Sequence, residues 1–595
     1  MTVAGGAGAW FAMEKGRQEM NTRDSGEDRL FRTPLHRAAA NLLRRWAKAC
    51  LPHYGPRGSM DLDLTSFPNA EGPSYYNQFA HWAMLLLSEG IVPGATAEEA
   101  GNFRRAALRN IEYVLSVTGE DFSTPHYSRG VDWGRHHGDW SNFFLLRSQG
   151  IIQEKALGSP SFREALGRAH RGAVERIYDR CLRQHGAFRQ GGEFVGNHAT
   201  WDMALLYEAG LHYGAREWSD FARQAIARLV LPCQQEHGGW PEADGMVVNY
   251  AMVTAQAVSL YAELSGDEAA RRAAERALPL FEFFSFGDET TPVVADCRMR
   301  YSATPFTAYL SPGFLRCAGG PDFCLRRIEA AIRWLDRNPL PDNAAAAPAF
   351  FAVFAEHLFR RGDASDWSAA RPDWRPALPV RKLEAGPWIA FLSHQLNKEM
   401  ASRFALDAQN FIEVWHREAG YLVGGGNSKH QPLVSTFRQK TGTRSYIPRS
   451  AKQVDASPAC AVCEYDFDNA RLEARLGADP RRVSVEFRAA SQDRNDDVFE
   501  AALTLPFKPG EVVQVEGSDN RWVIEPDHRI EHRFAAPALS FAWRGRRFTV
   551  PEGAFLFFPV VPHNPYTQNT LPPGDHYVAR LGFDIGLEPR AVVIE

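Results

Sequence analysis

The pattern of hydrophobic positions changes once along the chain. From about Thr33 to Arg361, apolar residues recur at intervals of three and four, which predicts a series of amphipathic helices. Turn-forming residues such as Gly90 and Gly210 predict the ends of two of these helices. The stretch 362–387 is rich in proline and has no period, which is typical of a linker. We therefore expect a helical domain before it and a different domain after it.

Short apolar runs broken by turn residues follow the predicted linker. They are rich in β-branched and aromatic residues, as in RRVSVEFRAA (481–490), AFLFFPVV (554–561) and RAVVIE (590–595). This pattern is typical of an antiparallel β-sandwich. The predicted organisation is a disordered tail over 1–30, a helical domain over 31–362, a linker over 363–387 and a β-sandwich over 388–595.

A loose repeat divides the helical half. Four segments place a polar or aromatic cluster before an apolar helix, and they start at Asn77, Asp139, Asn197 and Asn249, which lie 62, 58 and 52 residues apart. Such a spacing fits a pair of helices for each repeat. Stacked helical hairpins that curve round predict an (α/α) toroid, so the fold class is multidomain α+β with an N-terminal toroid and a C-terminal β-sandwich.

Composition excludes several classes of protein. The 595 residues include 67 basic and 71 acidic side chains, giving a net charge of -4, which argues against a nucleic-acid surface or a polybasic membrane anchor. The sequence has no run of about 18 uncharged apolar residues, so we expect no membrane span. The first 29 residues lack a basic segment before their small-residue patch, from which we expect a cytoplasmic protein.

Cysteine usage gives little sign of a disulfide or metal framework. Eight cysteines are spread over the whole chain, and only Cys460 and Cys463 form a C-x-x-C motif. No second pair accompanies this motif, and zinc sites need four ligands. We therefore expect no metal and no cofactor.

Two short segments carry the most specific chemistry. Asn197-His198 and Asn249-Tyr250 lie 52 residues apart, and each opens an apolar helix. Asparagine and histidine can neutralise the carboxylate of a uronic acid, so that the charge developing when the C5 proton leaves is stabilised. A tyrosine can take that proton and protonate the departing O4. The pattern predicts β-elimination at a uronate.

This architecture and these motifs resemble the alginate lyases and the heparinase II/III-like lyases. The resemblance implies that Asn197 neutralises the carboxylate, that His198 is a base or a second neutraliser, and that Tyr250 is the catalytic acid and base. It also implies a histidine from the first strands of the β-domain, for which His430 in the Gly-rich stretch GGGNSKHQ is our choice. His394 and His416 are the alternatives, although alternation with Val414 favours a structural role for His416.

Further polar and aromatic residues near the repeat openings suit a sugar-binding cleft, since aromatic rings stack on sugars and cations contact carboxylates. The tryptophans Trp82, Trp140 and Trp201 can equally be core residues, the loop with Gln234, His237 and Trp240 can be a simple turn, and the arginines and tyrosine near 300 can be surface residues. The predicted substrate-binding set is Tyr127, Arg129, Trp133, His137, Trp140, Trp201, Gln234, His237, Trp240, Arg300, Tyr301 and His416.

Two other functions remain open from the sequence. An (α/α) toroid also supports glycoside hydrolysis by two carboxylates, and acidic residues near the repeat openings are Asp139, Glu193, Asp202, Glu236 and Glu242. A carbohydrate-binding protein without catalysis would use the same aromatic residues. The expected partner is in each case a uronic-acid-containing oligosaccharide or polysaccharide. The sequence identifies neither the uronate nor the oligomeric state, and it leaves a homo-oligomer open.

Overall fold

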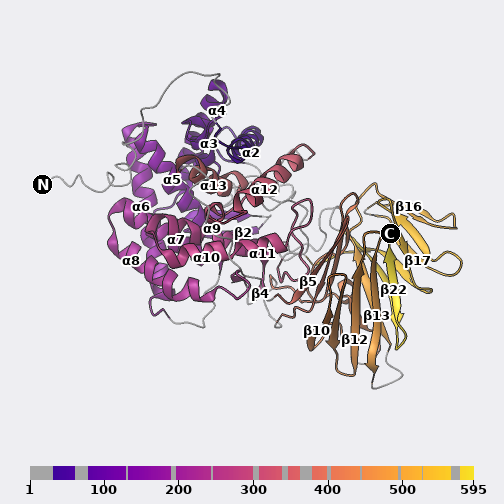
Figure 1. Ribbon diagram of the computed structural model, residues 1–595. Coiled ribbons are helices and arrows are strands. Elements are labelled where there is room, and N and C mark those ends of the chain that lie inside the picture. Colours follow the sequence, from indigo (N-terminus) through magenta and orange to yellow (C-terminus); the bar gives the residue numbers. More distant parts are fainter. Residues whose placement is uncertain are drawn as a thin grey trace. The chain divides into compact units, whose positions relative to one another are not determined.

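The computed structural model describes residues 31–60, 78–128, 131–188, 196–242, 245–298, 307–337, 346–361, 378–397, 404–441, 445–492, 498–525, 527–563 and 577–595. The chain separates into two compact units (Figure 1). The helical unit comprises 1–242, 249–282 and 304–375, and the β unit comprises 243–248, 283–303 and 376–595. The predicted tail over 1–30 lies outside the described residues.

The helical unit is built from hairpins that return to their starting point. Helices α3 and α4, α5 and α6, and α7 and α8 pack in pairs, and α12 and α13 both pack against α2, which closes the series as an (α/α) toroid (Figure 1). Its helices are α2 Pro34–Cys50, α3 His81–Ser88, α4 Ala97–Val117, α5 Asp139–Glu154, α6 Pro160–His185, α7 Asn197–Tyr213, α8 Arg216–Ala225, α9 Val248–Ser265, α10 Glu268–Arg276, α11 Leu278–Phe283, α12 Gly320–Leu335 and α13 Ala347–Arg361.

Helices α3, α5, α7, α9 and α13 form the inside of this ring. All eight residues of α3 are buried, whereas α4 buries only one face. The side chain of Phe350 on α13 lies at the centre and contacts aromatic rings from several directions, with ring centroids 4.5–6.4 Å apart. A helix that is buried all round belongs inside a larger helical assembly. The rings in contact with Phe350 are Phe79, Trp140, Phe144, Trp201 and Tyr309.

Three of the four predicted helix starts agree with the structure, the fourth, Asn77, lies outside the described residues, and one predicted helix end is wrong. Helix α5 begins at Asp139, α7 begins at Asn197, and α9 begins one residue before Asn249. Helix α3 ends at Ser88, as predicted, but α7 continues through Gly210 to Tyr213. A Cβ at position 210 would lie 2.7 Å from the backbone nitrogen of Ser219 on α8. Glycine there allows α8 to pack closely against α7 rather than ending the helix.

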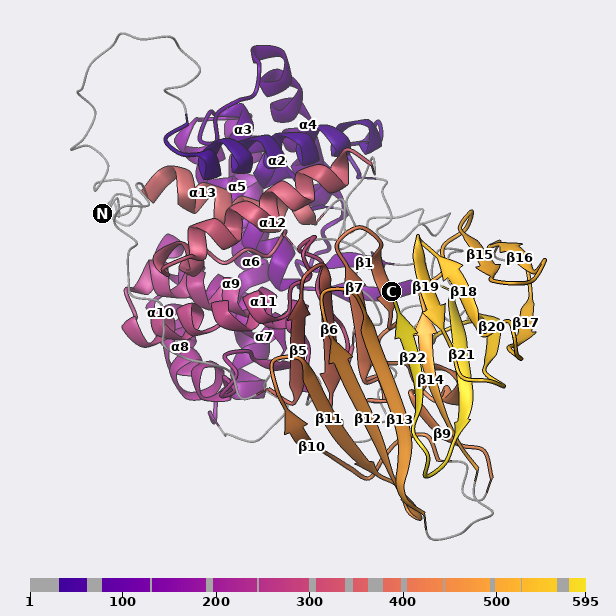
Figure 2. The same ribbon diagram turned by 45° about the vertical axis from the view of Figure 1, so that its right-hand side comes forward.

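The β unit contains three larger antiparallel sheets. Their strand orders are β10-β11-β12-β13-β22-β19-β18-β15-β16, β17-β20-β21-β14-β9 and β5-β6-β7-β8 (Figure 2). Buried side chains of all three sheets form one hydrophobic core, which includes Trp388, Phe437, Phe487 and Leu581. This arrangement is the predicted sandwich of antiparallel sheets. The strands are β5 Val380–Ala385, β6 Trp388–Ser393, β7 Ile412–His416, β8 Gly420–Val423, β9 Phe437–Gln439, β10 Ser450–Ala456, β11 Cys460–Asp466, β12 Ala470–Ala478, β13 Val483–Gln492, β14 Phe499–Leu505, β15 Val512–Val515, β16 Arg521–Val523, β17 Ile530–Arg533, β18 Ser540–Trp543, β19 Arg546–Thr549, β20 Phe555–Val560, β21 Val578–Ile585 and β22 Arg590–Ile594.

Two details differ from the domain boundaries expected from sequence. Strand β5 lies within the stretch 363–387 that was predicted to be a linker, and it pairs with β6. Segments 243–248 and 283–303, which lie inside the predicted helical domain, belong to the β unit. Rings of the second segment pack on the four-stranded sheet, for example Phe284 on Phe391 and Phe286 on Trp415. Among the described helices, none has a stretch apolar enough over a sufficient length to cross a membrane.

Candidate functional site

The first turn of α7 presents two neighbouring side chains with different surroundings. Asn197 is fully buried, whereas half of the His198 side chain is exposed. The backbone N–H of Asn197 donates a hydrogen bond of 3.2 Å to Oε2 of the buried Glu242. A carboxylate at this place satisfies a free N–H of the helix end and interacts favourably with the helix dipole. Glu242 therefore fixes where α7 starts.

A buried carboxylate holds His198 from behind. Nδ1 of His198 lies 3.1 and 3.0 Å from the two carboxylate oxygens of Asp139, the first residue of α5. The imidazole also stacks on the indole of Trp140, with 4.3 Å between ring centroids. The Asp139 carboxylate thus engages Nδ1 and sets the orientation of the ring.

The charges around His198 favour its cationic form. Desolvation of the ring would lower its pKa, but the Asp139 carboxylate outweighs this effect, with Glu242 and Asp202 acting in the same direction. The pKa of His198 is therefore raised above 6.5. A protonated imidazole that is half exposed can pair with an anion.

A second ion pair, between Arg180 and Asp202, accompanies the pair of His198 and Asp139. Arg180 on α6 binds both oxygens of Asp202 at 2.8 Å, and its other amino group donates to the carbonyl oxygen of His137 at 3.0 Å. Burial raises the pKa of Asp202 to about 6, with Arg180 opposing the shift and Asp139 adding to it. Arg180 thus joins α6, α7 and the segment that leads into α5, and it balances the buried acidic charge.

The Asn197 side chain has unused hydrogen-bonding capacity. Within the described residues, neither its amide nitrogen nor its amide oxygen has a hydrogen-bond partner, although the residue is fully buried. Leaving a buried polar group unsatisfied costs about 1–3 kcal/mol, so such groups in a folded protein call for an explanation. Because Asn197 lies at a helix start beside His198, a ligand that binds its amide group would explain the unsatisfied atoms.

Tyr250 lies at the corresponding place on the neighbouring helix. Nε1 of Trp201 on α7 donates to the carbonyl oxygen of Val253 on α9 at 3.2 Å, and Tyr207 contacts Tyr261 further along the same helices. The helices therefore run in the same direction. One turn back from that hydrogen bond, the start of α7 and the start of α9 lie level with each other. Tyr250 is half-buried at this start.

His430 belongs to the β unit and is held by its backbone. Its φ is 52°, which is strained for a residue with a side chain, and its N–H donates to Oδ2 of the buried Asp407 at 2.8 Å. The hydroxyl of Tyr446 donates to the same oxygen at 3.3 Å. The His430 side chain is 70% exposed. The loop therefore presents this imidazole to the surroundings, and its participation in a site with Tyr250 stays a prediction.

Three predicted substrate contacts are core residues instead. The indoles of Trp201 and Trp240 are at most 1% exposed, and each donates its N–H to a backbone carbonyl, that of Val253 or Val230. The indole N–H groups of Trp201 and Trp240 are therefore not available to a sugar, whereas the amide atoms of Asn197 have no partner within the described residues. Trp140 is 3% exposed and supports His198 from below. The alternative prediction of a core role is correct for Trp140 and Trp201, and Trp240, for which the alternative was a turn, is a core residue as well.

Two further residues that were predicted to contact substrate form hydrogen bonds with backbone groups instead. Nδ1 of His416 accepts hydrogen bonds from the N–H groups of Glu418 and Ala419, and the residue is 2% exposed. The amide nitrogen of Gln234 donates to the carbonyl oxygens of Gly238 and Ala273. Both side chains stabilise turns, which corrects the prediction that they bind substrate.

The remaining predicted contacts lie on or beside the β-hairpin that precedes α5, in the turn before β3, or outside the described residues. Strand β2 (Val131–His136) pairs with β1 (Thr124–Ser128), which carries Tyr127. Trp133 on β2 is 39% exposed and stacks on His126, and the ring of His137 donates to the carbonyl oxygen of Asp121. His237 accepts the N–H of Gly239 in the turn before β3 (Pro241–Glu242) and β4 (Gly245–Met246). Arg129, Arg300 and Tyr301 lie outside the described residues.

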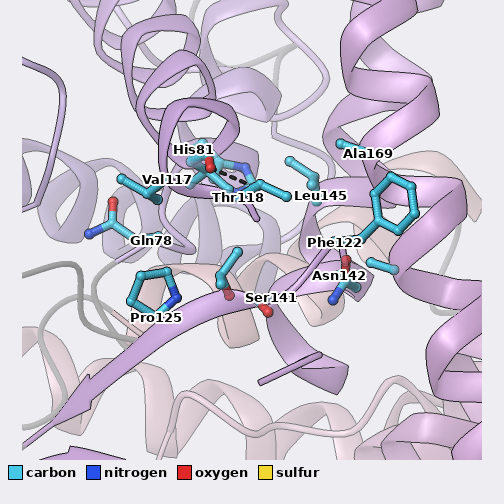
Figure 3. A pocket seen from close by; sticks show the side chains of 13 residues that line it. Gln78, His81, Val117, Thr118, Phe122, Pro125, Ser141, Asn142, Leu145 and Ala169 are labelled. Carbon is cyan, nitrogen blue, oxygen red and sulfur yellow. Dashed lines mark hydrogen bonds between the residues drawn. The ribbon is translucent and has the colours of Figure 1, made fainter. Parts of the chain in front are cut away.

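A small cavity lies near the first turn of α5 but does not contain His198. Its volume is about 40 Å³, enough for about one water molecule, and it is lined by residues such as Gln78, Phe122, Pro125 and Asn142 (Figure 3). His81, which also lines it, hydrogen-bonds Ser148 at 2.7 Å, and burial lowers its pKa to about 3. The cavity is too small for a sugar.

The C-x-x-C motif lies on strand β11 and does not form a metal site. Cys460 and Cys463 are three residues apart on a strand, so their side chains point to opposite faces of the sheet. Burial raises the pKa of the Cys463 thiol to about 12, which keeps it protonated. Across the described parts of the chain, no three histidine, cysteine or acidic side chains cluster in a way that could hold a metal.

Sequence reasoning missed the roles of three charged residues around His198. Asp139 and Glu242 were noted as acids of a hydrolase, and Arg180 was not noted. Their roles depend on contacts between residues 22–59 positions apart in the chain, which no local pattern reveals. The position of Asp139 at the start of a repeat was the available signal.

Comparisons with family models and with curated proteins found no match. Among solved structures, the chain is similar to a heparinase III, with 12% sequence identity, a TM-score of 0.45, and 99% of this chain and 88% of that chain covered. It is also similar to the chondroitin AC lyase of Streptomyces coelicolor A3 in complex with chondroitin sulphate (12% identity, TM-score 0.45, 97% and 80% covered). A third similar structure is a mutant of the heparan sulfate lyase HepC from Pedobacter heparinus (12% identity, TM-score 0.42, 93% and 82% covered). The latter two are lyases, and each likeness concerns the fold alone.

Proposed function

We propose that this protein is a polysaccharide lyase that cleaves uronic-acid-containing glycans by β-elimination. The observation that carries the proposal is the start of α7, where a half-exposed His198 bound to the buried Asp139 adjoins an Asn197 side chain with no hydrogen-bond partner in the described residues. A cation beside an amide donor suits a carboxylate ligand. Tyr250, level with this pair on α9, supplies a group for proton transfer.

The reaction assigns one role to each group. His198 and Asn197 bind the uronate carboxylate and stabilise the negative charge that develops on it as the C5 proton leaves. Tyr250, in its deprotonated form, takes this proton, the C4–O4 bond breaks, and a C4=C5 double bond forms. Tyr250 then delivers the proton to O4 of the leaving sugar, so the step needs no other reactant. His430 is a further candidate for contact with the substrate from the β unit.

The state of the acidic residues supports a lyase over a glycoside hydrolase. Inverting hydrolysis needs two carboxyl groups that face the scissile bond with space for a water molecule. Asp139 is bound to His198, Asp202 is bound to Arg180, and Glu242 accepts the N–H of Asn197. All three are at most 8% exposed. These carboxylates therefore bind groups of the protein instead of facing a substrate, whereas Glu236 is exposed and Glu193 lies outside the described residues.

The test is ultraviolet absorbance of the purified protein incubated with oligouronides from alginate, glucuronan, heparin-type glycans, hyaluronan and rhamnose-glucuronate polymers. A lyase produces a conjugated double bond, so absorbance rises with its substrate. Release of reducing sugar without absorbance would instead establish a hydrolase. Binding without either product would establish a carbohydrate-binding protein. We further propose that the enzyme acts in the cytoplasm on imported fragments, which cell fractionation tests.

A further inference from the structure

A second buried asparagine lies beside the proposed catalytic tyrosine. Asn249 is the second residue of α9, it is 1% exposed, and its amide oxygen has no hydrogen-bond partner within the described residues. It precedes Tyr250 in the chain as Asn197 precedes His198. In both pairs, the asparagine is buried and the residue after it is at least partly exposed.

The two asparagines lie level on adjacent parallel helices. Trp201 and Val253 are joined by a hydrogen bond of 3.2 Å, and Asn197 and Asn249 each precede one of these residues by four positions. Four residues make about one turn of an α-helix, so the two asparagines start the same layer of the ring. Three unsatisfied polar atoms are thus concentrated here: the nitrogen and oxygen of Asn197 and the oxygen of Asn249.

The protein uses similar buried amides elsewhere for packing. Gln256, two turns along α9 from Asn249, donates to the carbonyl oxygens of Leu310 and Phe350 and so ties α9 to the ring centre. Asn110 on α4 donates to the carbonyl oxygen of Gly58. The amide oxygens of Gln256 and Asn110 also lack a hydrogen-bond partner within the described residues, so an unpartnered oxygen alone does not mark a binding residue. What distinguishes Asn249 is its position at a helix start, next to the partly exposed Tyr250.

We propose that Asn249 is a substrate-binding residue of this site, whose amide oxygen accepts a hydrogen bond from a hydroxyl group of the bound uronate. The proposal rests on the proposed lyase function. An amide oxygen only accepts hydrogen bonds, so it selects a donor, while the cation of His198 and the amide of Asn197 bind the carboxylate. Because Asn197 and Asn249 are both buried, contact with the sugar requires a rearrangement at the two helix starts.

This assignment has a consequence for specificity. A site with a buried acceptor discriminates strongly against a ligand that lacks the matching donor, because the acceptor is then left unpaired. Uronates in which that hydroxyl is methylated or absent should be poor substrates. When a residue binds the substrate equally well in the ground state and in the transition state, its removal raises KM and leaves kcat unchanged.

The experiment measures kcat and KM of Asn249→Ala, Asn249→Asp and the control Asn110→Ala on an oligouronide that the wild type cleaves. We expect KM to rise roughly tenfold in Asn249→Ala with kcat little changed, since one hydrogen bond is lost. Asn249→Asp keeps the size of the side chain but adds a negative charge beside an anionic substrate, so its KM should rise further. Asn110→Ala should lower the melting temperature and leave KM unchanged.

The second arm uses oligouronides that are methylated in turn at each free hydroxyl. At the hydroxyl that Asn249 recognises, the wild type and Asn249→Ala should have the same KM, because the interaction is absent from both. The inference is overturned if both Asn249 variants keep wild-type KM on the unmodified substrate, while Asn197→Ala raises it. If the wild type forms no unsaturated product from any glycan, the proposed function fails, and the inference fails with it.

Discussion

Replacing Glu413 by glutamine should remove most of the pH dependence of the stability of the β unit between pH 4.5 and 8. Glu413 on β7 is 1% exposed. Its carboxylate accepts the N–H of Val293 at 3.1 and 3.2 Å and the hydroxyl of Tyr421. Burial raises its pKa to about 7, although Tyr421 and the backbone N–H groups favour the charged form. Glutamine retains an oxygen for Val293 but cannot ionise.

The size of the effect follows from the difference between the folded and unfolded states. The pKa rises from 4.5 to about 7, and one pKa unit corresponds to about 1.4 kcal/mol. Because the folded-state pKa is the higher one, the protonated carboxyl stabilises the fold fully below pH 4.5. This contribution is lost as pH rises to 7, and the loss amounts to about 3 kcal/mol. Half of it or more should be lost by pH 6.

Urea denaturation of wild type and Glu413→Gln at half-unit steps from pH 4.5 to 8, followed by tryptophan fluorescence, measures this difference. The free energy of unfolding of the wild type should fall relative to the variant by about 3 kcal/mol across the range. Tyr421→Phe is the companion variant. It removes a donor to the ionised carboxylate, so its stability should fall more steeply with pH than that of the wild type. Parallel profiles for wild type and Glu413→Gln would refute the reasoning.

Three predictions concern the proposed reaction. Tyr250→Phe should abolish formation of unsaturated product while calorimetry still detects oligouronide binding, because only the proton-transferring hydroxyl is lost; near-normal turnover would exclude the mechanism. His430→Ala should lower kcat strongly, and an unchanged rate would transfer its role to His394. Asp139→Asn should lower kcat/KM by about 10- to 100-fold, as for other side chains that orient a ligand-binding histidine. Since Asp139 raises the pKa of His198, NMR titration should find a lower pKa in that variant, and an unchanged one would contradict the assigned contact.

The periodicity of the sequence was sufficient to predict a helical half followed by a β-rich half, together with some of the helix starts and strands. Asp139 and Asn197 begin helices as expected, because a switch from polar clusters to apolar repeats is a local signal. The helix end predicted at Gly210 was wrong because glycine occurs both at the ends of helices and at positions where a second helix packs closely. Only the packing of Ser219 against it distinguishes these uses. Strand β5 was missed since a proline-rich surrounding dominates its six residues.

The candidate site was predictable only in part. Asn197, His198 and Tyr250 occupy helix starts that the sequence marks. Burial decides the fate of Trp201 and His416, and it depends on residues distant in the chain. An aromatic or imidazole ring has the same local signature whether it lines a cleft or fills a core. The pairing of Asp139 with His198, across 59 residues, belongs to the same class of information.

The filled centre of the helical ring limits how the proposed lyase can handle a long glycan. Within the described residues, Phe350 and the five aromatic rings around it fill the ring axis. In the proposed reaction, a polymer is therefore not threaded along this axis and drawn through while it is shortened. Each sugar must instead enter and leave on the same side of these rings.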